Sequence, residues 1–325
     1  MSLTGFRARY IFVLKYGINA VFRGRGTFLC RDKPDVPRIP ALGETAVPLH
    51  ECQTALFPRR HCDRTRRLSM ESLIDPKEKL YFRISLVISL LLYFLLVVSL
   101  IGIVYILIGV IITVFVHGLF VGRLKGNGIR VSDRQFPDVH RLASQLAAQM
   151  QLDPAPAIYV LQAGGLLNAF ATKFFDRSFV VIYSDVLELA SEKGEAELAF
   201  IICHEFAHIK RKHLEYRWLL YPSMVVPFLG AAYARACEYT CDRFGAHYRP
   251  DGVIGGLLVL AAGTKLYRTV NTQEFISQAD MEHGFWISFS EILATHPNLP
   301  KRLRAVGMGA VSQSIGSAIV RGEGA

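Results

Sequence analysis

The sequence His204-Glu205-Phe206-Ala207-His208 places two imidazole side chains four residues apart. On an α-helix, residues i and i+4 lie on the same face, so these two imidazoles can bind a single zinc ion. Glu205 lies about 100° around the helix from His204, where its carboxylate can take a proton from a water at the metal. Residues 196–202 are nearly all apolar, which predicts that the helix crosses a core and carries the zinc site to a cleft.

A zinc site of this kind needs a third protein ligand and an open coordination position. The metzincin pattern is excluded, because it requires Gly at 211 and His at 214, where this chain has Arg211 and Leu214. The remaining route is a carboxylate on a later helix. Glu238 and Asp242 are four residues apart, so both can face the zinc helix. We expect Glu238 to be the third ligand and Asp242 to orient a ligand histidine.

Four motifs in this order resemble the HtpX and CAAX-prenyl-protease type of membrane zinc metallopeptidase. They are the stretch 204–208, Glu238-Tyr239-Thr240-Cys241-Asp242, the upstream Asn168-Ala169-Phe170-Ala171 and the downstream Thr295-His296-Pro297. The resemblance covers residues 71–306. It implies a gluzincin-like fold, one Zn²⁺ bound by His204, His208 and Glu238, and endoproteolysis of membrane-associated or misfolded proteins.

Two positions depart from the family pattern. Ala234 stands where the family usually has Ser, and Cys241 where it usually has Ala. Both replacements are small, so the expected metal site is unaffected. Together with Glu205 as general base, the motifs predict a zinc metalloendopeptidase of quality-control type. The alternative is a non-catalytic membrane protein or scaffold with a structural or vestigial zinc site. The intact Glu205 argues against it, because a structural site needs no base.

Residues 84–122 contain no Asp, Glu, Lys or Arg over 39 positions. A bilayer needs only about 20 such residues, so we expect a transmembrane hairpin that turns near residues 99–102. Lys77, Lys79 and Arg83 precede this run, whereas Arg123, Lys125 and Arg130 follow it. By the positive-inside rule, both ends and the active site face the cytoplasm. We therefore expect a multi-pass protein of the bacterial inner membrane. A third apolar run, 218–234, either reaches the membrane or forms a buried helical hairpin.

The predicted fold class is α+β, with a mainly helical, zincin-like domain that carries a small sheet. Periodicity predicts a helix over 136–152 and strands over 157–162 and 178–183. The resemblance implies that the strand 178–183 lies beside the zinc cleft with an open edge. An open edge can bind a substrate segment as an added strand.

Three polar residues allow two interpretations each. Asn168 either contacts the substrate backbone, as the resemblance implies, or caps a turn. His296 either donates a hydrogen bond to the transition state or belongs to a structural turn before the last helix. Arg235 is either a charge partner of Asp242 or Glu238, or an oxyanion contact. His213 is expected near the ligands or on the surface.

The sequence predicts five segments along the chain. They are an irregular basic extension 1–69, a cytoplasmic leader 70–83, the hairpin 84–122, the peptidase domain 123–308 and a tail 309–325. The extension holds 13 Lys or Arg against 5 Asp or Glu, and Met70 resembles a natural start, so the extension is expected to be dispensable. Without a recognisable basic motif, the charge predicts no nucleic-acid partner. The expected partners are protein or peptide substrates and the lipid bilayer. The six cysteines predict no disulfide framework, although Cys237 or Cys241 can compete for the metal.

Overall fold

The computed structural model describes residues 70–162, 168–174, 177–190 and 194–307. The predicted extension 1–69 and tail 309–325 lie outside the described residues. The described part is mainly helical and carries a small mixed sheet, which confirms the predicted α+β class.

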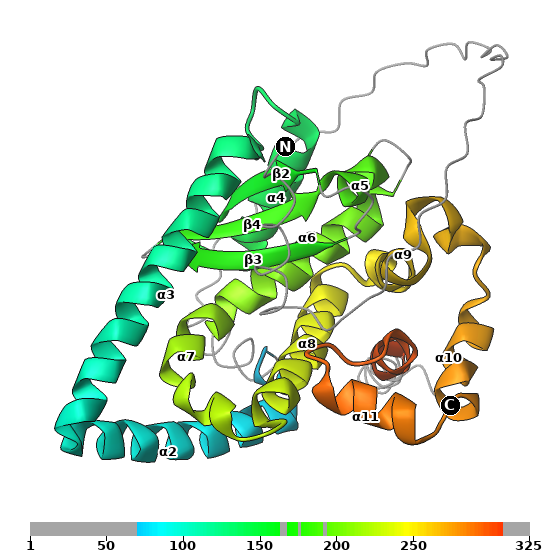
Figure 1. Ribbon diagram of the computed structural model, residues 1–325. Coiled ribbons are helices and arrows are strands. Elements are labelled where there is room, and N and C mark those ends of the chain that lie inside the picture. Colours follow the sequence, from blue (N-terminus) through cyan, green and yellow to red (C-terminus); the bar gives the residue numbers. More distant parts are fainter. Residues whose placement is uncertain (1–69, 163–167, 175–176, 191–193, 308–325) are drawn as a thin grey trace, which may run out of the picture. The chain divides into compact units, whose positions relative to one another are not determined.

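The described chain begins with two apolar helices, α2 (Pro76–Val98) and α3 (Leu100–Asn127), which are candidate membrane spans. Ser99 separates them, as the predicted turn near 99–102 required, and its hydroxyl accepts a hydrogen bond from the Gly102 N–H. Glycine is needed at 102, because a Cβ there would lie 2.2 Å from the Leu96 carbonyl oxygen. At 1.5 Å per residue the helices are about 34 and 42 Å long, enough to cross a hydrocarbon core of ~30 Å. They diverge from the turn (Figure 1).

The C-terminal part of α3, from the end of the apolar run onward, packs on the sheet. Leu124 forms a buried cluster with Phe170 and Val181. His117 Nε2 lies 2.7 Å from the carbonyl oxygen of Lys173. The helix therefore continues from the candidate membrane span into the folded domain without a break.

The sheet has the order β1-β2-β4-β3, with β2 and β4 parallel and the other pairs antiparallel. Its strands are β1 (Ile129–Arg130), β2 (Ala157–Leu161), β3 (Ala169–Phe174) and β4 (Arg177–Tyr183). β2 and β4 are the two predicted strands, whereas β1 and β3 were not predicted. The expected open edge is corrected: β4 is internal, because β2 and β3 pair with its two sides, and the edge strand next to it is β3.

The domain core is built around α6 (Glu195–Lys210), which packs against β3, β4 and α8 (Leu229–Tyr248). All residues of α6 from Leu198 to Ala207 are buried, as the apolar sequence predicted. Two glycines let neighbouring helices approach: a Cβ at Gly245 or Gly256 would lie 2.6 or 2.5 Å from the ring of Phe200. The other helices are α4 (Pro137–Gln149), α5 (Ser184–Leu187), α7 (His213–Leu219), α9 (Val253–Leu266), α10 (Thr272–Met281) and α11 (Phe285–Leu293).

The apolar run 218–234 is not a buried helical hairpin. It comprises the end of α7, a short 3₁₀ turn η2 (Pro222–Val225) and the start of α8. Trp218, Tyr221 and Val225 are exposed, at 46, 58 and 73% of their maximum. The segment is attached to α2, because the Ser223 N–H donates to Ser89 Oγ at 3.1 Å. These exposed apolar residues thus belong to a segment that lies beside the first candidate span, and Figure 1 shows α7 above α2.

Candidate active site

The helix α6 carries His204, Glu205 and His208 at its C-terminal half, and all three side chains are largely buried. The two imidazole rings lie with their centroids 5.2 Å apart, as expected for positions i and i+4. Within the part of the chain that the structure describes, Glu205 forms no hydrogen bond or ion pair. Its carboxylate is therefore available to accept a proton.

Glu238 of α8 faces both histidines. His204 Nε2 lies 3.3 Å from Glu238 Oε2, and His208 Nε2 lies 3.3 Å from Glu238 Oε1. Burial raises the pKa of Glu238, but His296, the two α6 histidines and Arg302 together hold it well below its ordinary value. An ionised carboxylate and two imidazole nitrogens are therefore close together, and Glu238 as the third zinc ligand stays a prediction.

Asp242 of α8 contacts His204, the histidine that the sequence predicted it to orient. Its Oδ1 lies 3.0 Å from His204 Nδ1, so the Nδ1–H can be donated to Asp242 while Nε2 faces Glu238. Asp242 is in turn bound by Arg302, whose Nε and Nη2 donate to its two oxygens at 2.7 and 2.6 Å. Burial raises the pKa of Asp242, but the charge and hydrogen bonds of Arg302 lower it more.

The prediction that Arg235 is a charge partner of Asp242 or Glu238 is wrong in this structure. Arg235 Nη1 donates to the carbonyl oxygens of Glu291, Ile292 and Ala294 and thereby anchors the end of α11. Arg302 has the role instead, and its Nη1 also lies 3.3 Å from Glu238 Oε2. Sequence reasoning missed Arg302 because no local spacing connects it to residues on α8.

A second chain of contacts leads from His208 to the first candidate span. His208 Nδ1 lies 3.1 Å from His213 Nδ1. His213 Nε2 lies 3.3 Å from Glu78 Oε1, and the same oxygen accepts from Arg211 at 2.7 Å. Burial is the main cause that lowers the pKa of His213 to about 4, so this imidazole is neutral at pH 7. Its Nδ1 can then accept the Nδ1–H of His208, which leaves His208 Nε2 free for a metal.

His296 is brought to the site, although it lies far along the chain. Its Nε2 is 3.3 Å from Glu238 Oε1, and it lies in a bend before the helix 299–307. Glu238 raises the pKa of His296, but burial and the nearby Arg302 lower it more, so the net shift is downward. Both interpretations of His296, transition-state contact and structural turn, are compatible with this position.

Asn168 lies at the start of the edge strand β3. Its carbonyl oxygen accepts from the Tyr183 N–H at 3.0 Å, and the residue is half-buried. The backbone of Asn168 therefore continues the β3–β4 pairing by one residue.

The donor set fits a divalent cation. Burial lowers the pKa of His204, but its hydrogen bonds to Asp242 and Glu238 outweigh this and raise the pKa to about 10. The two carboxylates thus stabilise positive charge at the point where the imidazoles meet, which is what a bound Zn²⁺ requires. Cys241 also lies within 4.8 Å of ligand atoms of His204 and His208. Burial raises the pKa of its thiol well above the ordinary value, so Glu238 is the better anionic donor.

A paired-histidine helix with an unpaired glutamate, a carboxylate on the adjacent helix and an open-edged sheet together define a metallopeptidase. Comparison with protein families agrees: the model of peptidase family M48 matches residues 133–224 and 218–308, together more than half of the chain. The chain belongs to peptidase family M48, and the HtpX-like resemblance is thereby confirmed. No curated protein matches the chain.

Proposed function

We propose that this protein is a membrane-bound zinc metalloendopeptidase that cleaves membrane-associated or misfolded proteins at the cytoplasmic face of the bacterial inner membrane. The single observation that carries the proposal is the convergence of His204 Nε2 and His208 Nε2 on the carboxylate of Glu238, at 3.3 Å each. Glu205, on the same helix, has a buried carboxylate without a protein partner among the described residues.

His204, His208 and Glu238 would hold the zinc, with Asp242 and His213 fixing the two imidazoles through their Nδ1 atoms. Bound zinc polarises the scissile carbonyl and lowers the pKa of water, as in other zinc peptidases. Glu205 accepts the proton of the attacking water and then delivers it to the leaving amine.

Two further residues act on the substrate in this proposal. His296, 3.3 Å from Glu238, donates a hydrogen bond to the oxygen that becomes negative in the transition state. The substrate backbone adds to the free edge of β3, where Asn168 contacts it. This edge lies on the strand that packs against α6, so an added segment would run beside the zinc helix.

The charge pattern supports the proposed membrane topology. The flanks of the two candidate spans are basic, whereas the turn at Ser99 is uncharged, and by the positive-inside rule this favours a cytoplasmic location for both flanks and the peptidase domain. The exposed apolar residues at 218–228 lie beside α2, and their exposure supports contact of this segment with lipid. The protein is then multi-pass, with the bilayer and protein substrates as partners.

The competing possibility is a non-catalytic membrane protein with a structural or vestigial zinc site. A closed structural site needs no unpaired carboxylate, and a buried carboxylate without a partner lowers stability, so its presence is better explained by a catalytic role. Glu205 therefore favours the enzyme.

The test is Glu205→Gln in the full-length protein purified in detergent. The variant should bind one zinc per chain, as metal analysis would show, because its ligands are intact. Proteolysis of an unfolded protein such as casein should fall by about 10²–10⁴-fold, which is the typical contribution of a general base. Equal proteolysis by variant and wild type would contradict the proposed role. Absence of proteolysis by wild type that carries zinc would favour the non-catalytic alternative.

A further inference from the structure

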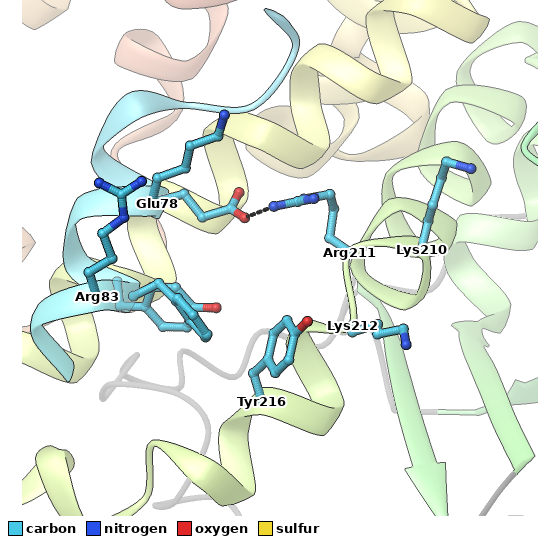
Figure 2. A pocket seen from close by; sticks show the side chains of 9 residues that line it. Glu78, Arg83, Lys210, Arg211, Lys212 and Tyr216 are labelled. Atoms are coloured by element: carbon cyan, nitrogen blue, oxygen red, sulfur yellow. Dashed lines mark hydrogen bonds and ion pairs between the residues drawn. The ribbon is translucent and has the colours of Figure 1, made fainter. Parts of the chain in front are cut away.

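A cavity of about 380 Å³ lies between the first turns of α2 and the junction of α6 with α7 (Figure 2). Its lining contains three aromatic residues, a single acid, Glu78, and five basic residues: Lys79, Arg83, Lys210, Arg211 and Lys212. None of these basic residues is needed as a zinc ligand. The cavity is thus a concentrated positive site outside the candidate active centre.

The only acid in the lining offsets only one of the five positive charges. Glu78 accepts a hydrogen bond from Arg211 Nη2 at 2.7 Å, and Figure 2 marks this contact with a dashed line. Lys210 is already engaged, because its Nζ donates to the carbonyl oxygen of Met150 at 2.7 Å. This leaves Lys79, Arg83 and Lys212 as the cations that can serve a ligand.

These three cations are held loosely. Lys79 Nζ lies 3.6 Å from the exposed Glu71, and Lys212 Nζ lies 4.0 Å from Glu215. Arg83 forms no hydrogen bond or ion pair with any other residue in the described ranges. Exposed pairs of this length contribute little, so the side chains can turn toward an anion at small cost.

The cavity lies at the basic end of the first candidate span. Lys79 and Arg83 are four residues apart on one face of α2, and the charge-free run begins at the next residue, Ile84. Basic residues at the end of an apolar span are located among the head groups. Tyr216 lines the cavity and Trp218 follows on α7, both exposed, and such aromatic residues are enriched at the membrane interface.

We propose that this cavity binds a phosphate group, and that its source is an anionic membrane lipid. Arg83 and the two lysines would neutralise the phosphate, and Tyr216 would supply a hydroxyl donor. Phe82, whose ring centroid is 5.0 Å from that of Tyr216, forms an apolar wall. The acyl chains would follow the exposed apolar face of α2 at Leu80 and Val87. This inference does not depend on the proposed peptidase activity.

The test uses full-length protein in bilayer discs of equal parts phosphatidylcholine and phosphatidylglycerol, followed by extraction into detergent and measurement of retained lipid by mass spectrometry. Wild type should retain phosphatidylglycerol in preference to phosphatidylcholine. In Lys79→Gln/Arg83→Gln this retention should fall about tenfold, because both charges are removed from one site. The matched control is Arg123→Gln/Arg130→Gln, which removes two exposed charges that flank the other span and lie outside the cavity. The control should retain the lipid.

A second arm separates the two sources of phosphate. Thermal unfolding is measured with inorganic phosphate and with glycerol 3-phosphate, for wild type and for Lys212→Gln. If these soluble anions stabilise wild type but not Lys212→Gln, and no lipid is retained, the cavity binds phosphate but its ligand is free phosphate and not a lipid. Equal loss of lipid in both double variants, with no stabilisation by phosphate, would overturn the proposal, since the attraction would then be general surface charge. The unfolding temperatures without ligand show whether each variant is folded.

Discussion

Arg302 binds both carboxylate oxygens of Asp242, with Nε 2.7 Å from Oδ2 and Nη2 2.6 Å from Oδ1. Both side chains are almost completely buried, and Asp242 in turn accepts from His204. The orientation of one proposed zinc ligand therefore depends on an arginine that is contributed by the last described helix, 60 residues away in sequence from Asp242.

Removing the guanidinium should strongly destabilise the protein. Arg302→Met leaves Asp242 buried without its partner, and breaking such a pair costs about 3–5 kcal/mol. Chemical denaturation in detergent would measure the loss. The control is Arg304→Met, two residues further on, which breaks an exposed pair with Asp280 and should change stability little. An equal loss of stability in the two variants would show that the buried Arg302–Asp242 pair contributes no more than the exposed pair.

The third zinc ligand can be tested by comparing two glutamates. Glu238→Gln should lower zinc affinity by more than about 100-fold, because even residues that only orient ligands account for about 10–100-fold. Glu215→Gln should leave zinc affinity unchanged, since Glu215 is paired with Lys173 at 2.6 Å. Competition with a zinc-binding dye would measure both. If Glu215→Gln lowers zinc affinity and Glu238→Gln does not, the third ligand is Glu215.

His213 should control zinc binding through His208. His213→Phe removes the acceptor at 3.1 Å from His208 Nδ1 and should weaken zinc binding by about 10–100-fold. His213→Asn should recover part of the affinity, because its Oδ1 can accept the same hydrogen bond. A control, His140→Phe on the exposed face of α4, should have no effect. If Asn and Phe at 213 bind zinc equally, the contact between the two imidazoles does not orient His208.

The proposed topology predicts which sites a membrane-impermeant thiol reagent can reach from outside. Ile101→Cys, next to the turn, should be labelled, whereas Lys125→Cys should not. Position 101 is exposed and preferable to Gly102, where a Cβ would collide with Leu96. Labelling is measured above that of the unchanged protein. If the reagent labels Lys125→Cys from outside and does not label Ile101→Cys, the opposite topology is correct.

The sequence predicted the elements whose signals are local. The spacing of His204 and His208 and that of Glu238 and Asp242 follow from one helical period, and each pair appears on one face as expected. The apolar run of residues 84–122 was equally clear, and the turn at Ser99 agrees with it.

What the sequence did not predict depends on contacts between distant segments. Glu78 contacts Arg211 across 133 residues, and no periodicity records such a contact. The edge strand β3 has the sequence AFATKF, whose polar and apolar residues do not alternate, so its pairing with β4 is a tertiary effect. For the same reason the strand 178–183 was assigned an open edge that belongs to its neighbour.

The unbroken course of α3 sets a geometric limit on the substrate. Because His117, Phe120 and Leu124 of this one helix dock on the sheet, the described chain has no flexible joint between the candidate span and the domain that bears the zinc ligands. If α3 crosses the bilayer, the catalytic groups stand at a constant height above the lipid surface. A peptide bond would then be selected by its distance from the membrane as well as by its sequence.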